Sequence, residues 1–216
     1  MYIVYRSIRF LTGFLLSYGP TALKMRIWDK EYSGDKWNFA DNTVGDCVYA
    51  HLEKYSADRS ILDIGCGSGN TATEMAADSY KSYLGVDISK EALAKASKRS
   101  EACGRKDKNS FACSDFLSYV PTDKYDVILF RESMYHVPLH KVKSTLDRYT
   151  QYLKDGGVVI VRMFSGDRET DKSKYRPNAM MKIIEEEFDV LERCQYESLG
   201  RPTVMVFRPR RPVQTN

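Results

Sequence analysis

A loop with glycine at every second position is the feature that most limits what this chain can fold into. Residues 63–69 read DIGCGSG, follow the apolar pair Ile61 and Leu62, and lead into a helix-like stretch from Thr71. Glycine is needed where a loop turns sharply and lets a ligand touch the bare backbone. In open α/β sheets, such a loop between a strand and a helix holds nucleotide-like ligands. The loop therefore predicts an α/β fold with a nucleotide-type site at the end of this strand.

The spacing of the glycines separates two classes of site. The dinucleotide fingerprint G-x-G-x-x-G would require a third glycine where the chain has Asn70. The carboxylate of Asp63, two residues before the first glycine, also suits an amine better than a pyrophosphate. The pattern D-x-G-x-G-x-G resembles motif I of the class I S-adenosylmethionine-dependent methyltransferases. The resemblance implies that the backbone of Gly65, Cys66 and Gly67 packs against the adenosylmethionine, and that Asp63 helps to hold its methionyl ammonium.

A second acidic residue follows at the distance that Rossmann-like folds use for a ribose. Residues 83–88 read YLGVDI, an apolar strand that ends in Asp87, about 20 residues beyond the glycines. A carboxylate can accept hydrogen bonds from two neighbouring hydroxyl groups at once. We therefore expect Asp87 to bind the ribose diol, with Ile88 beside it at the cofactor. The alternative role of Asp87, as N-cap of the next helix, is filled better by Ser89.

Two further segments follow in the order that the family has. Ser114, Asp115 and Phe116 resemble the third motif, in which the acid accepts from the adenine amino group and the apolar residue packs on the base. An acid at a strand end can also be a simple cap or turn residue, which is the alternative for Asp115. The apolar strand 125–130 is followed by Arg131–His136, which resembles the segment lining the methyl-transfer cleft and adds Arg131 to the cofactor residues. The resemblance covers about residues 60–165.

The segment after this strand also supplies the candidates for catalysis. Methyl transfer is an in-line displacement, so the protein mainly aligns the acceptor with the sulfonium. An oxygen or nitrogen acceptor usually also loses a proton, and histidine is the side chain whose ordinary pKa lies near neutrality. We expect His136 to be the base, with Glu132 and Tyr135 as alternatives; the other interpretation of His136 is packing behind the methionine of the cofactor. Glu132, His136 and His140 are spaced by four, but Pro138 interrupts a helix there, so no metal site is expected.

An aromatic segment near the N-terminus is expected to cover the site. Residues 28–32 read WDKEY, and Trp37 follows soon after. Small-molecule members of the family often begin with W-D-x-x-Y and a later tryptophan, in a segment that folds over the cofactor. Aromatic faces stabilise a sulfonium by cation–π attraction, so Tyr32 and Trp37 are candidate cofactor residues. Alternatively, Trp28 and Trp37 only fasten the N-terminal segment to the domain.

The first 24 residues are an extension with several possible roles. Residues 2–18 place basic and small residues on one helical face and apolar residues on another. This pattern suits a helix packed on its own domain or a partner, an interfacial membrane anchor or, less well, a secretion signal. Methyltransferase-like sequence begins just after Met25, which is a candidate start. We divide the chain into an amphipathic extension (1–24), a methyltransferase domain (25–209) and a basic tail (210–216).

The order of the expected elements agrees with the resemblance. Strands and helices alternate through the middle of the chain, and the chain ends in a helix and two strands, expected at 179–187, 188–196 and 203–208. The final pair predicts a hairpin that makes one edge antiparallel. The expected fold is therefore α/β and Rossmann-like, with a seven-stranded, mostly parallel sheet, one antiparallel strand, and helices on both faces.

Two helices are expected from apolar spacing alone. The first covers residues 43–55 and has Val44, Val48 and Leu52 on one face. The second covers residues 139–153, with its buried stripe at Val142, Leu146, Tyr149 and Leu153, and is expected to end at the glycine pair 156–157.

Composition narrows the class and the partners of the protein. A chain of 216 residues with 43% hydrophobic and 29% charged residues suits one globular domain. Much of the net charge of +4 lies in the tail 208–212 (RPRRP), which has no interleaved aromatics, so a nucleic-acid partner is disfavoured. Five scattered cysteines without a C-x-x-C pair indicate neither a disulfide framework nor a zinc site. We expect a cytoplasmic protein, peripheral to a membrane if residues 2–18 bind one, and leave its oligomeric state open.

The sequence implies the cofactor, S-adenosylmethionine, without naming the methyl acceptor. The default is an oxygen or nitrogen of a small molecule: a metabolite, a sugar or a natural-product intermediate. Its pocket is expected between Arg131–His136, Trp28–Trp37 and Ser165–Pro177, where basic side chains would favour a carboxylate or phosphate. The alternative is that residues 165–177 form a plain solvated loop. Two alternatives stay open, a non-catalytic S-adenosylmethionine-binding protein and a nicotinamide oxidoreductase. Asn70 and the terminal helix-strand-strand order count against the second.

Overall fold

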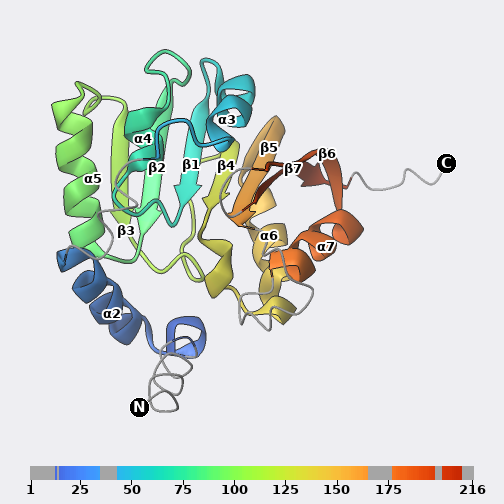
Figure 1. The fold of residues 1–216 in the computed structure, drawn as a ribbon, viewed down its shortest axis with the longest axis horizontal. Helices are drawn as coiled ribbons and strands as arrows, with labels where there is room; N and C mark the ends of the chain where they lie inside the picture. Colours follow the sequence, from blue (N-terminus) through green and yellow to red (C-terminus); the bar gives the residue numbers. More distant parts are fainter. Residues whose placement is uncertain (1–12, 14, 35–42, 165–176, 198–200, 211–216) are drawn as a thin grey trace.

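The computed structural model describes residues 13, 15–34, 43–164, 177–197 and 201–210, and Figure 1 shows their arrangement. In this part of the chain, seven strands form one sheet: β1 (Ser60–Ile64), β2 (Ser82–Asp87), β3 (Asn109–Cys113), β4 (Tyr125–Arg131), β5 (Leu153–Phe164), β6 (Phe188–Gln195) and β7 (Pro202–Pro209). The α-helices are α2 (Thr21–Ser33), α3 (Val48–Ser56), α4 (Asn70–Glu74), α5 (Lys90–Ala102), α6 (Val142–Thr150) and α7 (Pro177–Glu187). Two 3-10 helices, η2 (Met134–His136) and η3 (Leu139–Lys141), follow β4.

The strand order creates the point where a ligand can bind. The sheet runs β3-β2-β1-β4-β5-β7-β6, so the chain leaves β1 towards one edge and later returns on its other side as β4. β1 is parallel to both β2 and β4, whereas β7 is antiparallel to both β5 and β6. This confirms the expected seven-stranded, mostly parallel sheet with one antiparallel strand. In open sheets, ligands bind at the carboxyl ends of the strands where the order reverses, here between β1 and β4.

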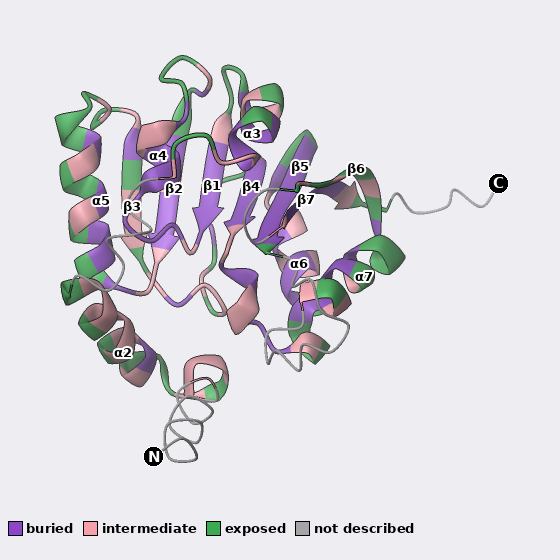
Figure 2. Ribbon diagram, in the orientation of Figure 1, coloured by how far each residue is buried: buried purple, intermediate pink, exposed green. Residues whose placement is uncertain are grey.

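Both faces of the sheet are covered by helices, as expected. On one face α6 and α7 pack against the strands through a cluster that contains Leu146, Tyr149 and Ile184. On the other face α3 and α4 pack through a cluster that contains Leu52 and Ala72. Figure 2 shows this layering: the strands are mostly buried, and the outward faces of the helices are exposed. The central parallel strands β1 and β4 are therefore buried on both sides along most of their length.

The helix α2 lies apart from these two layers. In Figure 1 it sits at the end of the sheet to which the arrow of β1 points, next to the start of α5. The boundary predicted between residues 24 and 25 falls inside this helix. Most of the expected amphipathic segment 2–18 lies outside the described residues. Within the segment the structure describes residues 13 and 15–18, which are helical. Among the described helices none is both long and apolar enough to cross a membrane.

The start of α3 differs from the sequence prediction. The helix begins at Val48 rather than at residue 43, and Val44 is 78% exposed instead of sharing the buried face of Val48. The reason is local hydrogen bonding. The backbone and hydroxyl of Thr43 donate to the Glu74 carboxylate, and an oxygen of Asp46 accepts from the backbone of Val48. Side-chain hydrogen bonds of this kind offer the backbone an alternative to helical bonding.

The end of the second expected helix also differs. α6 stops at Thr150, and β5 begins at Leu153, which pairs with Tyr125 of β4. Gly156 has a φ of +75°, but it produces an irregularity within the strand rather than the helix stop that was expected. Leu153 is buried as predicted, although it belongs to the sheet.

The corrected start of α3 can be tested with a matched pair of valines. We expect Val48→Ala to lower the free energy of unfolding by about 2 kcal/mol, because a fully buried side chain loses apolar contact and leaves a cavity. Val44→Ala should change it by less than about 0.5 kcal/mol. Urea denaturation of both variants measures this difference. Equal losses would show that residue 44 is part of the buried helix face after all.

Candidate functional site

The glycine loop after β1 is held so closely by its neighbours that side chains would not fit. Gly65, Gly67 and Gly69 have φ values of +77°, +54° and +78°, which side chains rarely adopt. A Cβ on Gly65 would lie 2.4 Å from the Cβ of Ser133, and a Cβ on Gly67 would lie 2.7 Å from the Tyr32 hydroxyl oxygen. The loop is thus a piece of bare backbone covered by the segment after β4 and by α2.

Asp87 fastens this loop to the end of β2. The backbone N–H of Gly67 donates to Asp87 Oδ2 at 2.9 Å, and that of Ser89 donates to Oδ1 at 2.9 Å. Burial raises the pKa of Asp87, and these N–H groups oppose the rise. Ser89 takes the N-cap role, because its hydroxyl accepts from the backbone of Ala92 at the start of α5. Asp87 is therefore positioned by the loop and the helix start, and Ile88 is half-buried beside it.

Asp63 is a buried carboxylate, and one of its oxygens has no hydrogen-bond partner among the described residues. The residue is only 1% exposed, and its Oδ2 accepts a hydrogen bond from the Tyr83 hydroxyl at 2.6 Å. Burial raises its pKa to about 6, although the Tyr83 hydroxyl and the charge of Arg131 act in the opposite direction. Within the described residues, Asp63 Oδ1, Arg131 Nε and Ser133 Oγ are buried without a hydrogen-bond partner. Buried polar atoms in proteins are normally bonded, so these three at the ends of β1 and β4 suit a polar ligand.

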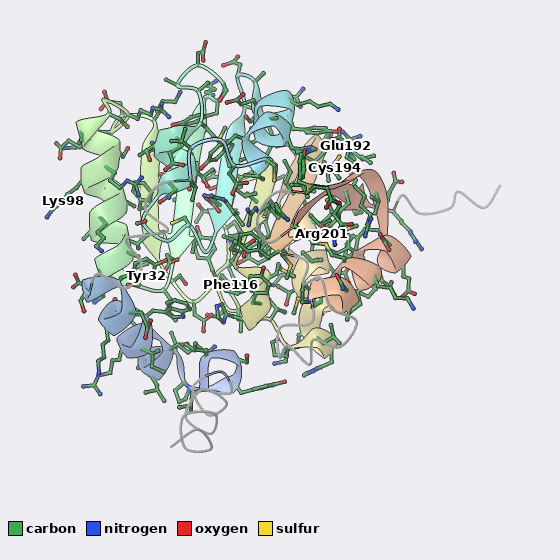
Figure 3. The ribbon with its side chains drawn as sticks, in the orientation of Figure 1. Tyr32, Lys98, Phe116, Glu192, Cys194 and Arg201 are labelled. Carbon is green, nitrogen blue, oxygen red and sulfur yellow. The ribbon has the colours of Figure 1, made fainter. Side chains whose placement is uncertain are left out.

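Asp115 lies after β3 and is also buried. The Ser114 N–H donates to the backbone carbonyl of Asp87 at 2.9 Å, which joins the ends of β2 and β3. The Asp115 carboxylate accepts from the ammonium of Lys24 at 2.9 Å and from the N–H of Leu117 at 3.0 Å. Figure 3 shows Phe116 at the same end of the sheet, together with Tyr32 from α2. The three expected acids therefore lie along the carboxyl ends of β1, β2 and β3.

The helix α2 carries the aromatic residues to this end. The ring of Trp28 meets the ring of His136 edge-on, with centroids 5.2 Å apart, and lies 6.1 Å from the ring of Tyr32. Asp29 accepts from the Ser89 hydroxyl at 2.8 Å, so α2 is also bound to the start of α5. Trp37, the other expected aromatic, is outside the described residues.

A network of charges holds the segment after β4. Asp46 forms ion pairs of 3.0 Å with both Arg131 and Arg162, and Arg162 is also paired with Glu132. Burial alone would raise the pKa of Asp46, but the two guanidinium groups bring it below its usual value. Glu132 has a φ of +55°, an uncommon conformation for a residue with a side chain. The Tyr135 hydroxyl donates to Glu132 at 2.7 Å, so the Glu132 carboxylate is engaged at both oxygens.

The residues that first suggested a metal-like spacing do not converge. Glu132 bonds Arg162 and Tyr135, His136 contacts Trp28, and His140 stacks on Tyr18 with centroids 6.5 Å apart. Across the described ranges, no three acidic, histidine or cysteine side chains are grouped in a way that could hold a metal ion.

Several residues of this site escaped the sequence analysis. They are Lys24 and Asp29 on α2, Tyr83 under Asp63, and the pair Asp46 and Arg162. One signal was present, because Lys24, Trp28 and Tyr32 are spaced by four and so share a face of the helix. The partners of Asp46 and Tyr83 depend on strand neighbours, which the local pattern does not encode.

Comparisons with known proteins agree with this geometry. A family model described as a methyltransferase domain matches residues 37–199. The chain is 27% identical to probable thiol methyltransferase 2 of Arabidopsis thaliana over 192 residues, which covers 81% of this chain and 83% of that protein. It is 32% identical to trans-aconitate 2-methyltransferase of Streptomyces avermitilis over 105 residues, or 48% of this chain and 38% of that protein. The chain spans less than half the length of four of the curated relatives that it matches.

A solved structure shares the same fold. It is the N-methyltransferase NodS of Bradyrhizobium japonicum in complex with S-adenosyl-L-homocysteine, with a TM-score of 0.67 and 21% identity. The match covers 87% of this chain and 98% of NodS.

The buried state of Asp63 predicts a pH dependence of stability. Its pKa of about 6 in the folded protein lies above the ordinary value of 3.8, so the folded state binds the proton more tightly than the unfolded state. The contribution of protonated Asp63 to the free energy of unfolding is therefore complete below the ordinary pKa, and it is lost as the pH rises through the pKa of the folded protein. Relative to Asp63→Asn, the wild type should lose about 3 kcal/mol between about pH 4 and pH 7. Urea unfolding of both ligand-free proteins across this range measures the difference, and parallel curves would contradict it.

Proposed function

The chain belongs to the class I S-adenosylmethionine-dependent methyltransferases, and we propose that it transfers the methyl group of this cofactor to an oxygen or nitrogen atom of a small-molecule acceptor. The observation that carries the proposal is the bare glycine loop beside three buried polar atoms that have no partner among the described residues. A cofactor with a polar amino-acid end and a nucleoside satisfies such a site. Its sulfonium supplies an activated methyl group when it is bound.

Each part of the cofactor has residues suited to it. Asp63 would hold the methionyl ammonium, and the neighbouring Arg131 Nε and Ser133 Oγ are available as donors to the carboxylate. Asp87, fixed by the N–H groups of the loop and of Ser89, would accept from the ribose diol. Asp115 and Phe116 would bind the adenine.

The hydrogen bonds around the acceptor side favour His136 as the base. Both oxygens of Glu132 are engaged, and Arg162 provides one of the partners. The Tyr135 hydroxyl donates to Glu132 and accepts from the backbone of Phe164. Burial and the charge of Glu132 raise the pKa of Tyr135 far above its usual value, which makes it a poor base near neutrality. We therefore assign proton removal to His136 and the shaping of the acceptor side to Glu132 and Tyr135.

Two relatives bear on the acceptor class. The Streptomyces relative is named for trans-aconitate, which carries carboxylates. This fits the acidic acceptor that the basic residues of 165–177 led us to expect. Most of that segment, 165–176, lies outside the described residues. The Arabidopsis relative is named as a thiol methyltransferase, so a thiol is the second candidate acceptor. A thiol ionises more readily than an alcohol, and its methylation would depend less on His136.

The two other functions can be separated by ligand binding. In a nicotinamide oxidoreductase, the strand beside β5 would be expected to run parallel to it. In this sheet that strand is β7, which is antiparallel to both of its neighbours. A non-catalytic binding protein would bind S-adenosylmethionine without turnover. Calorimetry with S-adenosylhomocysteine and NADH, followed by labelled S-adenosylmethionine with pools of small acids, amines, sugars and thiols, distinguishes the three.

A matched pair of glycines tests the cofactor loop. We expect Gly67→Ala to weaken S-adenosylhomocysteine binding by at least about tenfold, because the added Cβ meets the Tyr32 hydroxyl and occupies the backbone surface that the ligand needs. Gly104 has a φ of +70° and open space around it, so Gly104→Ala carries similar backbone strain away from the site. Isothermal titration should show unchanged affinity for this control. Normal binding by Gly67→Ala would remove the basis of the proposed function.

Two histidines provide a test of the catalytic role. His136→Ala should lower kcat by about 100-fold or more towards an oxygen or nitrogen acceptor found in the screen, because general-base catalysis contributes factors of this size. The affinity for S-adenosylhomocysteine should change little. His140→Ala, at an exposed position four residues further on, should leave both unchanged. If His136→Ala weakens cofactor binding as much as it slows turnover, His136 is a packing residue.

A further inference from the structure

We propose that Lys24 is a positioning residue for recognition of the adenine base: it orients the Asp115 carboxylate and makes α2 part of the cofactor site. This inference rests on the proposed function, in which Asp115 reads the adenine amino group. Lys24 lies outside the region that the family model matches, residues 37–199.

The manner in which α2 docks is unusual for a helix. Lys24 is the one buried residue among the 13 of α2, and its ammonium lies 2.9 Å from Asp115 Oδ2. The two side chains are only 9% and 7% exposed. Lysine is almost never fully buried unless it is paired. A buried ion pair is also a poor source of stability compared with apolar packing, because both charges lose their hydration. The pair therefore calls for a role beyond fastening the helix.

The hydrogen bonds of Asp115 indicate what that role is. A carboxylate offers about four acceptor positions. The Leu117 N–H donates to Oδ1, while Lys24 and the Thr21 hydroxyl both donate to Oδ2, the latter at 3.3 Å. Donors on both oxygens fix the plane of the carboxylate, and the described residues leave one acceptor position on Oδ1. One further N–H, such as that of an adenine amino group, can fill this position without displacing a partner.

A second contact holds α2 at the neighbouring strand end. Asp29, five residues after Lys24, accepts from the Ser89 hydroxyl and from the backbone of Glu91 at the start of α5. Ser89 in turn donates its backbone N–H to Asp87, the expected ribose ligand. Polar contacts from one helix thus reach the surroundings of both acids that would bind the adenosine. A chain that began at Met25 would lack both donors to Asp115 Oδ2.

The test uses two ligands that differ at the position in question. S-adenosylhomocysteine carries the amino group, whereas S-inosylhomocysteine has an oxo group there, which a carboxylate cannot bind. Calorimetry with the full chain would compare the wild type, Lys24→Met and the matched control Lys30→Met, whose lysine is exposed on the same helix. We expect the wild type to prefer the adenine ligand by about 100-fold, and Lys24→Met to lower this preference to about tenfold or less. Lys30→Met should keep the wild-type preference.

The outcomes separate the proposal from simple stapling of α2. If Lys24→Met loses affinity for the adenine ligand alone, the result supports positioning. The same holds if Lys24→Met, added to an Asp115→Asn variant, does not lower that variant's preference for the adenine ligand any further. Equal loss for both ligands, or no loss, overturns it. If Lys24→Met does not fold, the same two ligands are compared with Thr21→Val, which removes a single donor to Oδ2. A loss of affinity for the adenine ligand alone again supports the proposal, and an equal loss for both ligands or no loss overturns it. Failure of the wild type to bind S-adenosylhomocysteine would instead refute the proposed function itself.

Discussion

The close approach of other elements to the backbone of residues 65–69 is the constraint on which the site depends. Ser133 reaches Gly65 from the segment after β4, Tyr32 reaches Gly67 from α2, and the Gly67 N–H is bonded to Asp87 at the end of β2. The approaches of Ser133 and Tyr32 could not form if residues 65 and 67 carried side chains. The positive φ values cost little at glycine, so the loop can present bare backbone surface without strain, while the N–H groups of Gly65 and Gly67 bond to Val86 and Asp87. The positions of Asp87 and of α2 both follow from this geometry.

A row of buried acids lies along the strand ends next to this loop, and each is kept there by different means. Asp87 relies on backbone N–H groups, Asp63 on the Tyr83 hydroxyl, and Asp115 on the Lys24 ammonium. Burying a carboxylate costs free energy unless its charge is compensated. The compensation of Asp63 is incomplete in the ligand-free protein, as its raised pKa shows. A cationic amine, as proposed for the methionyl end of the cofactor, would supply the missing partner at this position.

The segment after β4 is organised in the opposite way, with charges that pair with one another. Asp46 and Glu132 are both paired with Arg162, and Tyr135 closes the network onto the backbone of Phe164. Such a network holds Glu132 in its uncommon backbone conformation. Under the proposed function this segment would line the acceptor side, where methyl transfer depends on alignment of two reacting atoms.

The sequence by itself determined the order of the strands and helices, the site of the glycine loop, and the acids at the strand ends. These features are encoded locally. Apolar periodicity marks the strands and helices, and the spacing of glycines and acidic residues marks the loop and the strand ends. The tertiary structure decided the partners. Lys24 and Asp115 are 91 residues apart, and Asp46 and Arg162 are 116 apart, so only the crossing of the chain brings them together. It also decided where α3 begins, because the donors of Thr43 are used by Glu74 on another helix. A local pattern records whether a residue is suited to burial, but the partner of a buried charge is set by whichever element the fold places beside it.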